Sequence, residues 1–297
     1  MSAKIIDGKF FSQQVLEETK AKISKFQSTY HIAPGLAFVR VGEDPASIVY
    51  VEAKTRACKQ LGIQSKTSVL PGNTTETQVL ELIRKLNQQK SIHGILVQAP
   101  LPAGIQQDRV FEAIDPRKDV DGFHPLNIGK LAVGDPTGFI ACTPAGIHQL
   151  LIRSGIETSG KYVVILGRSR IVGKPMALIL MGRGKYADAS VTVCHSQSRD
   201  LASLTRQADI LIAAMGQNRF VKADMVRQGA AVIDVGISRI PDSSKKSGYR
   251  LEGDVDYESV SKKAGWITPV PGGVGPMTIA MLMANTLKAA QLQLSGS

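Results

Sequence analysis

Tyr50 and Lys54 form the first pair of side chains in the chain whose types and spacing could do chemistry. They stand four positions apart in a stretch expected to be helical, so both project from one face of that helix. A phenol beside an ammonium offers a flat platform for a ring, next to a group that can carry a proton. A helical lysine is more often simply solvated, so the pair alone does not define a site.

Gln98 ends an apolar strand expected over residues 94–98, and Pro100-Leu101-Pro102 then turns the chain out of the sheet. The carboxyl ends of parallel strands form the usual ligand-binding edge of an α/β sheet. The Gln98 amide could therefore orient a nearby lysine or a heterocycle, or it could only cap the turn.

The segment KDVDGFHP (118–125) contributes Asp119, Asp121 and His124. A buried carboxylate in such a segment suits a ring that carries adjacent N–H donors, because charge-assisted hydrogen bonds are short and strong. The alternative for Asp119 is a purely local role, since aspartate often stabilises a turn by bonding to nearby backbone amides.

A second constellation begins at YVVILGRSRIVGKP (162–175). A strand meets Gly167, a loop follows, and Gly173 precedes a helix that starts near Pro175. This order aims backbone amides and a helix N-terminus at a phosphate group. The glycine spacing is not the full dinucleotide fingerprint, because Ser169 occupies the place of the second glycine.

The strand that follows ends at His195 and Ser196, where an NAD-binding protein would carry an acidic residue for the ribose hydroxyls. Asp200 comes only after Arg199. Small hydroxyl groups and arginine at this strand end favour a 2′-phosphate, and hence NADP over NAD. Arg168 is a second candidate partner for that phosphate.

The loop PVPGGVGPMT (269–278) lies between a short apolar strand and an apolar helix. Its glycines leave backbone amides uncovered, so a flat ligand could approach the main chain closely. The alternative is a stiff turn between domains. Two further glycine motifs, DVG (234–236) and GDVD (253–256), also follow strands, where the nicotinamide half of a cofactor could lie.

Apolar strands alternate with helical stretches along the chain, as in parallel α/β proteins. We expect strands over 36–41, 67–70, 94–98, 162–166, 190–194, 209–214, 231–235 and 266–270. We expect helices over 11–26, 45–61, 75–88, 144–152, 175–181 and 276–292. Between Asp115 and Pro144 the rhythm breaks, and we expect an irregular connection there at a domain boundary.

The chain has 297 residues, enough for about two domains, with 43% hydrophobic and 21% charged residues. It holds no apolar run of about 18 residues and no signal-like N-terminus, so we expect a cytoplasmic protein. Three separated cysteines and five scattered histidines predict neither a disulfide framework nor a metal site. The net charge of +11 is spread out and aromatic content is only 5%, which suits an anionic substrate or cofactor, or simple solubility, better than nucleic acid.

Seven motifs carry a likeness to one family. In order over nearly the whole chain, they are YVEAK (50–54), VQAPLP (97–102), KDVDGFHP (118–125), CTPAG (142–146), GRSRIVGKP (167–175), GDVD (253–256) and TPVPGGVGPMT (268–278). Taken together, they resemble the methylenetetrahydrofolate dehydrogenase/cyclohydrolases. One position departs from the family pattern: Ala99 stands where the strand-end motif usually has leucine, so the apolar wall near Gln98 is slightly smaller.

The resemblance implies a two-step enzyme of one-carbon metabolism that also serves purine biosynthesis. Hydride passes from 5,10-methylenetetrahydrofolate to NADP, and water then converts the methenyl product to 10-formyltetrahydrofolate. Lys54 would transfer the proton of the hydrolysis, with Gln98 tuning its proton affinity. Tyr50 would stack on the folate, and Asp121 would bind the pterin ring. These four are the expected catalytic residues, and the others expected at the folate are Pro100, Leu101, Pro271, Gly272 and Gly273.

The same resemblance implies two α/β lobes around a cleft, the second a Rossmann-like dinucleotide-binding domain. Residues 1–145 and 275–297 would form the folate-binding catalytic domain, and residues 146–274 the NADP-binding domain. The protein would act on tetrahydrofolate derivatives as a homodimer, with no nucleic acid or membrane partner. The residues expected at NADP are Thr143, Gly167, Arg168, Ser169, Val172, Gly173, Pro175, His195, Ser196, Gly236 and Ile237.

Three other functions stay open at this point. The protein could be a dehydrogenase without hydrolase activity, which the role of Lys54 would decide. It could be a basic nucleic-acid-binding or regulatory protein built on the same scaffold, and salt-dependent binding to duplex DNA would then be expected. An NAD-linked hydroxy-acid dehydrogenase would need an acidic residue near position 195, and the sequence has none at that strand end.

Overall fold

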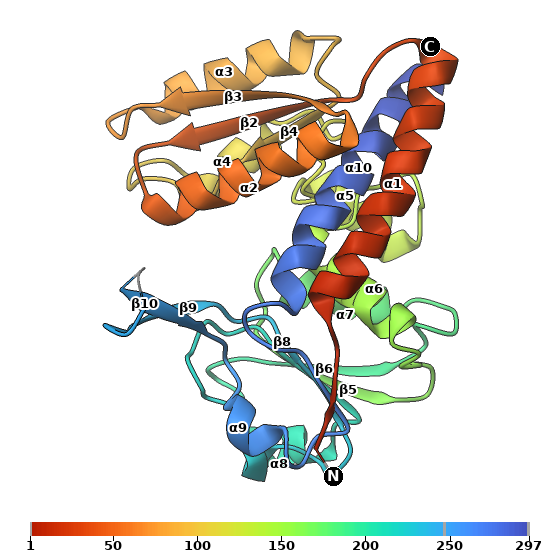
Figure 1. The fold of residues 1–297 in the computed structure, drawn as a ribbon, viewed down its shortest axis with the longest axis vertical. Helices are drawn as coiled ribbons and strands as arrows, with labels where there is room; N and C mark the ends of the chain where they lie inside the picture. Colours follow the sequence, from red (N-terminus) through yellow and green to blue (C-terminus); the bar gives the residue numbers. More distant parts are fainter. Residues whose placement is uncertain (1, 246–247, 296–297) are drawn as a thin grey trace. The chain divides into compact units, whose positions relative to one another are not determined.

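The computed structural model describes residues 2–245 and 248–295, which form two compact units (Figure 1). The three-stranded unit comprises residues 13–142 and 279–295, and the six-stranded unit comprises residues 2–12 and 143–278. Helices α1 (Gly8–Tyr30) and α10 (Val274–Ser295) each contribute residues to both units. The α/β class expected from the sequence is confirmed.

The sheet of the three-stranded unit is parallel, with β2 in the centre between β3 and β4. Its strands are β2 (Gly35–Val41), β3 (Gln64–Leu70) and β4 (Gly94–Val97). The helices that follow the strands are α2 (Pro45–Leu61), α3 (Glu76–Gln88), α4 (Gln107–Glu112) and α5 (Pro125–Val133).

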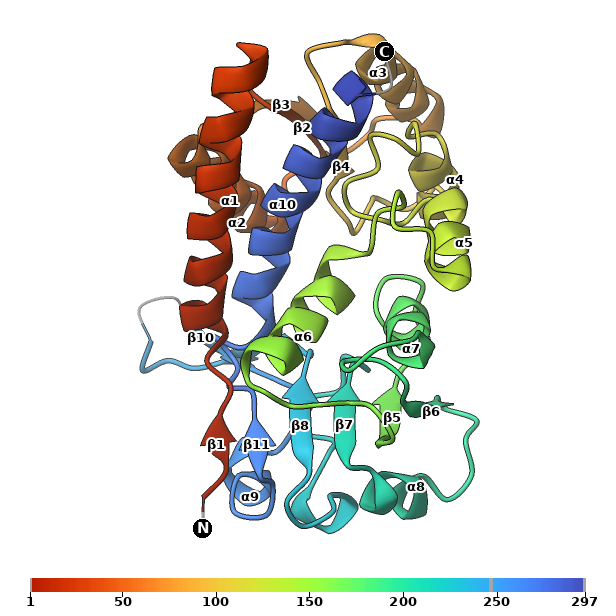
Figure 2. The same cartoon turned by 90° about the vertical axis from the view of Figure 1, so that its right-hand side faces the viewer.

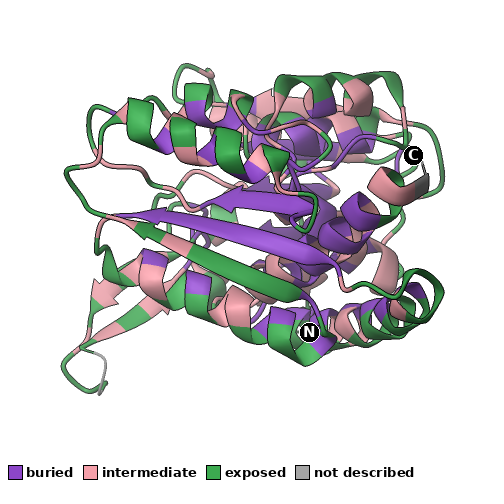
Figure 3. Cartoon of the chain, turned by 90° about the horizontal axis from the view of Figure 1, so that it is seen from above, coloured by how far each residue is buried: buried purple, intermediate pink, exposed green. Residues whose placement is uncertain are grey.

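Every residue of β2 is buried, whereas β3 at the edge of the sheet is mostly exposed (Figure 3). Because successive side chains of a strand point to opposite faces, Phe38 enters one core cluster and Val39 enters another. The Phe38 cluster includes residues of α1, α2 and α10, and the Val39 cluster includes residues of α3 and α4. Both faces of β2 are therefore covered, as is usual for parallel sheets.

Local sequence signals fix both ends of α2. The Asp44 side chain accepts a hydrogen bond from the Ser47 amide at 2.7 Å, and Pro45 occupies the first turn, where its missing N–H costs nothing. Gly62 ends the helix with a φ of 77°, a left-handed conformation that glycine adopts without strain. The predicted range of 45–61 is confirmed.

The six-stranded unit contains a parallel sheet in the order β1-β11-β8-β7-β5-β6 (Figure 2). A separate antiparallel hairpin pairs β9 (Ser238–Pro241) with β10 (Tyr249–Glu252). The helical elements of this unit are α6 (Cys142–Arg153), α7 (Gly173–Met181), α8 (Leu201–Gln207), η1 (Ala223–Met225) and α9 (Tyr257–Val260). The sheet strands are β1 (Lys4–Ile5), β5 (Tyr162–Leu166), β6 (Ser190–Cys194), β7 (Ile210–Ala213), β8 (Ala231–Asp234) and β11 (Trp266–Ile267).

Two parts of the fold differ from the sequence-based expectations. The expectation of an irregular connection between Asp115 and Pro144 was wrong, because helix α5 lies within this segment. That helix has only nine residues and contains Gly129, so it leaves little periodicity to detect. In addition, β1, which pairs with β11 in the six-stranded unit, was not among the expected strands.

Within the described ranges, no helix combines the length and apolar content needed to cross a membrane. The described His, Cys, Asp and Glu side chains form no group of three or more that could hold a metal ion. Cys58, Cys142 and Cys194 are buried free thiols.

The packing of β2 predicts the effect of truncating its side chains. Phe38 is fully buried, so Phe38→Ala should lower the free energy of unfolding by about 3–5 kcal/mol through lost burial and a new cavity. Val69 on the neighbouring edge strand is 48% exposed, so Val69→Ala should change it by less than about 1 kcal/mol. Urea denaturation followed by circular dichroism measures both values, and equal losses would contradict this account of the core.

Candidate active site

Lys54 and Gln98 meet in the three-stranded unit although 44 positions separate them in the sequence. Lys54 Nζ donates a hydrogen bond to Gln98 Oε1 at 3.0 Å. The side-chain nitrogen of Gln98, Nε2, donates to the backbone oxygen of Ala99 at 2.7 Å. This second bond fixes which end of the side-chain amide faces the lysine. Gln98 thus orients a lysine and also stabilises its own turn, which combines two roles that the sequence left open.

The fold brings these two residues together through the central strand. The backbone N–H of Gln98 donates to the backbone oxygen of Val39 at 2.8 Å, so Gln98 continues the β2–β4 ladder to the carboxyl edge of the sheet. Helix α2 begins shortly after β2 and packs on the sheet through Val51 and Cys58, which are buried. Lys54 lies on this helix and is half-buried.

Two effects act on the pKa of Lys54 in opposite directions. Burial lowers the pKa of the Lys54 ammonium, and the nearby carboxyl of Asp121 offsets part of that effect by favouring the charged form. Removal from water also raises the pKa of Asp121 to about 6, against the opposing influence of Lys54. Burial therefore favours the uncharged form of both groups.

Cys142 is a third member of this group that the sequence analysis missed. Its Sγ donates to the Val120 oxygen at 3.3 Å, and burial keeps the pKa of the thiol well above its usual value. The motif CTPAG predicts a site residue only at Thr143, because a lone buried cysteine carries no chemical signal in a sequence.

The segment KDVDGFHP divides into structural and chemical residues. The Asp119 carboxylate accepts hydrogen bonds from the amides of Phe123 and His124 at 3.2 and 2.8 Å, and from the Asn127 side chain at 2.8 Å. Lys118 Nζ donates to backbone oxygens at the C-terminal end of α3. Asp119 thus has the loop-stabilising role that was the alternative, which leaves Asp121 as the carboxylate beside Lys54.

Asn285 on α10 is another residue that the sequence did not indicate. Its side-chain nitrogen donates to the Val120 oxygen at 2.8 Å and to the Ile140 oxygen at 3.1 Å. These bonds tie the residue before Asp121 to the segment just before Cys142. No local pattern predicts them, because the partners lie far from Asn285 along the chain.

The remaining residues expected at the folate have varied surroundings. Tyr50 is 42% exposed, one helical turn before Lys54. Pro100 is exposed and Leu101 is half-buried, directly after Gln98. The loop over 271–273 belongs to the six-stranded unit, where a Cβ on Gly273 would lie 2.6 Å from the Pro269 oxygen. Glycine is therefore required in this loop by close main-chain packing.

A cavity of about 490 Å³ lies at the carboxyl ends of β5 and β6 in the six-stranded unit. Its glycine turn is tightly packed: a Cβ on Gly167 would lie 2.2 Å from the Ala214 oxygen, and a Cβ on Gly173 would lie 2.0 Å from the Gly167 oxygen. Such a bare turn before a helix suits the phosphates of a dinucleotide. The cavity is lined by Leu166, Gly167, Arg168, Ser169, Cys194, His195, Ser196, Ser198, Leu201, Ala214, Met215, Gln217 and Phe220.

The charge of this cavity suits an anionic cofactor. Among the described residues that line it, none is acidic, and Arg168 supplies a positive charge. The Ser169 hydroxyl accepts the Val172 amide at 3.1 Å, so the serine in the place of the second glycine shapes the turn. His195 and Ser196 follow β6 at the cavity wall. These residues fit the phosphates and the 2′-phosphate of NADP.

Other residues expected at the cofactor do not line this cavity. Thr143 on α6 shares a hydrogen bond of 3.1 Å with Thr278 on α10. Val172 and Pro175 are buried at the start of α7. Gly236 is buried beside Asp254, and Ile237 is 44% exposed.

The fold and these two sites define a class of protein: an α/β enzyme with a dinucleotide-binding unit. The family model for the catalytic domain of tetrahydrofolate dehydrogenase/cyclohydrolase matches residues 6–121. The model for the NAD(P)-binding domain of the same enzymes matches residues 141–294. The chain belongs to the tetrahydrofolate dehydrogenase/cyclohydrolase family.

Relatives agree over nearly the whole length. The protein named bifunctional protein FolD from Chlorobium luteolum is 57% identical over 95% of this chain and 96% of its own. The crystal structure of the bifunctional methylenetetrahydrofolate dehydrogenase/cyclohydrolase from Campylobacter jejuni has 47% identity and a TM-score of 0.91, covering 98% of this chain and 100% of its own. The Trypanosoma brucei enzyme, complexed with NADP cofactor and inhibitor, has 37% identity and a TM-score of 0.93, covering 99% of both chains.

The charge relation between Asp121 and Lys54 gives a direct prediction. The Asp121 carboxylate favours the ammonium form of Lys54, so Asp121→Asn should move the already lowered pKa of Lys54 further down. NMR titration of protein labelled with 13C at the lysine ε-carbons measures this pKa. An unchanged or higher pKa in the variant would contradict the account.

Proposed function

We propose that this chain catalyses both steps of the family's reaction at one folate site. In the first step, 5,10-methylenetetrahydrofolate is oxidised to 5,10-methenyltetrahydrofolate with NADP. In the second step, water converts that product to 10-formyltetrahydrofolate. The observation that carries the proposal is the Lys54–Gln98 hydrogen bond beside Asp121, in a chain matched by both domains of the family.

The dehydrogenase step requires little acid–base help from the protein, because the folate nitrogens stabilise the methenyl cation. NADP, when bound, accepts the hydride. The work of the chain in this step is to bind and orient both ligands. We assign the cofactor phosphates to the Gly167–Gly173 turn and to Arg168, Ser169, His195 and Ser196, which combine bare amides, hydroxyls and positive charge.

The cyclohydrolase step needs a group that moves a proton as water attacks the cation. We assign this role to Lys54, because its lowered pKa favours a neutral amine that can accept a proton. Gln98 holds the amine in place through a neutral oxygen, which stabilises the ammonium less than a carboxylate would. Asp121 is assigned to the N–H donors of the pterin ring, and Tyr50 to stacking on the folate.

Membership of the family supports several further proposals. We infer a homodimer in the cytoplasm whose 10-formyl product serves purine biosynthesis. We also assign Pro100, Leu101, Pro271, Gly272 and Gly273 to the folate, and Thr143, Val172, Pro175, Gly236 and Ile237 to the neighbourhood of the cofactor. Residues 1–145 with 275–297 would be the folate-binding domain, and residues 146–274 the NADP-binding domain.

Replacing Lys54 separates the two activities. Lys54→Met removes the titrating group and keeps a side chain of similar length, so hydrolysis should fall by about 10²–10⁴-fold while hydride transfer persists. Lys59→Met, on the exposed surface of the same helix, is the matched control and should alter neither rate. The two rates are measured with methenyl- and methylenetetrahydrofolate. Equal losses of both activities in Lys54→Met would contradict the assigned role.

Replacing Arg168 tests the choice of cofactor. If its guanidinium pairs with the 2′-phosphate, Arg168→Gln should weaken NADP binding by about tenfold or more and leave NAD binding unchanged. Arg183→Gln is the control, because Arg183 is exposed and lies outside the cavity. Calorimetric titration of each variant with NADP and with NAD gives the ratio of the two dissociation constants. An equal loss for NADP and NAD would show that Arg168 does not read the 2′-phosphate.

A further inference from the structure

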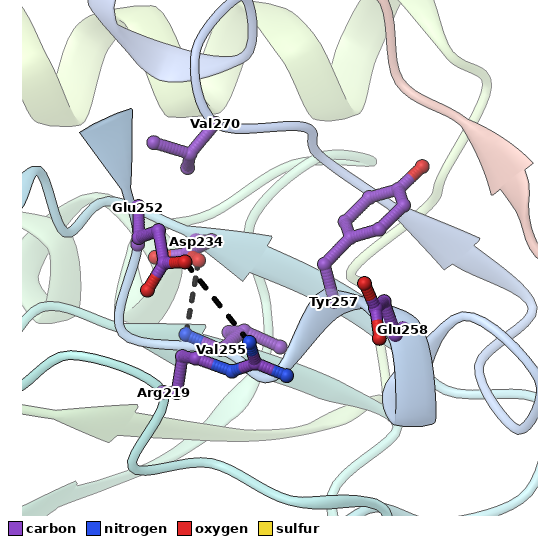
Figure 4. Close-up of a pocket in the computed structure, with 8 residues that line it drawn as sticks. Arg219, Asp234, Glu252, Val255, Tyr257, Glu258 and Val270 are labelled. Atoms are coloured by element: carbon purple, nitrogen blue, oxygen red, sulfur yellow. Dashed lines mark hydrogen bonds and ion pairs between the residues drawn. The ribbon is translucent and has the colours of Figure 1, made fainter. Parts of the chain in front are cut away.

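Two buried carboxylates lie at or shortly after strand ends of the six-stranded unit. Asp234 ends β8 and Asp254 follows β10, and their exposed fractions are 4% and 0%. Asp234 accepts hydrogen bonds from the amides of Gly236, Asp254 and Val255 at 3.0, 2.9 and 3.0 Å; Figure 4 shows Asp234 beside Val255. One carboxylate therefore ties the turn after β8 to the segment after β10.

Asp254 extends this network to a third loop. Its Oδ2 accepts hydrogen bonds from the amides of Met215 and Gly216 at 2.6 and 3.0 Å. Gly216 has a φ of 68°, so these amides belong to a left-handed turn that directly follows β7. A single buried side chain thus satisfies two consecutive amides of a loop 38 and 39 positions away.

The surrounding glycines are shaped by the carboxylates. A Cβ on Gly236 would lie 2.2 Å from Asp254 Oδ1, and a Cβ on Gly253 would lie 1.9 Å from Asp234 Oδ2. The glycine motifs at 234–236 and 253–256 therefore make room for these side chains. Asp254 Oδ1 is buried without a hydrogen-bond partner in the described part of the chain, so holding a carboxylate here is costly. The hydrogen bonds that Asp254 Oδ2 accepts from the Met215 and Gly216 amides offset part of this cost.

The loop that Asp254 holds is a wall of the cofactor cavity. Met215 and Gln217 line that cavity together with Gly167 and Arg168. The loop also abuts the glycine turn, since the Ala214 oxygen lies 2.2 Å from the place of a Cβ on Gly167. A shift of the loop would therefore change the shape of the cavity and the space available to the phosphate-binding turn.

We propose that Asp254 is a positioning residue for NADP, which fixes the Met215–Gly216 turn as one wall of the cofactor cavity without touching the ligand. This inference rests on the proposed function, because it takes NADP as the occupant of the cavity. It adds a residue that acts on cofactor affinity through the backbone of another loop.

The test compares cofactor binding with cyclohydrolase activity in the same variants, because hydrolysis of methenyltetrahydrofolate consumes no NADP. Asp254→Ala removes both bonds to the turn, so the Kd for NADPH should rise by about tenfold or more while the rate of hydrolysis is kept. Asp254→Asn keeps one acceptor oxygen and should stay within about threefold of the unaltered protein. Fluorescence titration with NADPH measures the Kd.

Asp209→Ala is the matched control. The Asp209 carboxylate also accepts a backbone amide, that of Tyr162 at 2.9 Å, but at the amino ends of β5 and β7. Its removal should leave the Kd for NADPH unchanged. An unchanged Kd in Asp254→Ala, or a parallel loss of NADPH binding and hydrolysis, would overturn the proposal, since the second result indicates only general destabilisation.

Amide hydrogen exchange on the unaltered protein without cofactor gives a test that needs no variant. The amides of Met215 and Gly216 should exchange much more slowly than those of the exposed residues Gln217 and Asn218. Equal exchange rates would overturn the proposal. Failure of the proposed function is a distinct outcome, because the unaltered protein would then neither bind NADPH nor hydrolyse methenyltetrahydrofolate.

Discussion

The hydrogen bond from Lys54 to Gln98 sets the constraint on which the three-stranded unit depends. A lysine that works as a base must be partly withdrawn from water and must not be paired too strongly with an anion. A glutamine oxygen at 3.0 Å holds the amine without a full opposing charge. Burial lowers the pKa of Lys54 because it disfavours the ammonium. The Asp121 carboxylate limits that fall because it favours the ammonium.

This hydrogen bond depends on how the surrounding elements are held in place. Lys54 reaches Gln98 only if α2 keeps its position on the sheet and β4 keeps its register with β2. The Asp44 cap and buried Val51 fix the helix, and the bond from the Gln98 amide to the Val39 oxygen fixes the strand end. The structural roles of Lys118 and Asp119 serve the same end, because they hold the turn that presents Asp121.

Local signals in the sequence were sufficient for part of this description. The limits of α2 follow from Asp44 and Gly62, and the strand end at Gln98 follows from the prolines after it. The glycine turn at Gly167 and the lack of an acidic residue directly at the end of β6 indicated where the cavity lies and that its described lining is free of acidic residues.

Other features depend on contacts that no local pattern contains. β1 is two residues long and is defined only by its pairing with β11, near the opposite end of the sequence. Asn285 acts on oxygens far from it in the chain, and Asp254 acts on a loop that precedes it by almost forty positions. Helix α5 was missed for a different reason, since nine residues that include Gly129 give a weak periodic signal.

One measurement tests the central claim most directly, a spectrophotometric time course with 5,10-methylenetetrahydrofolate run in parallel with NADP and with NAD. The account predicts that NADPH forms and that the methenyl intermediate does not accumulate, beyond what a control for spontaneous hydrolysis explains. NADPH formation with accumulating methenyltetrahydrofolate would contradict the role of Lys54 and leave a dehydrogenase alone. Turnover with NAD only would contradict the cofactor assignment, and no turnover with either cofactor would contradict the proposed function.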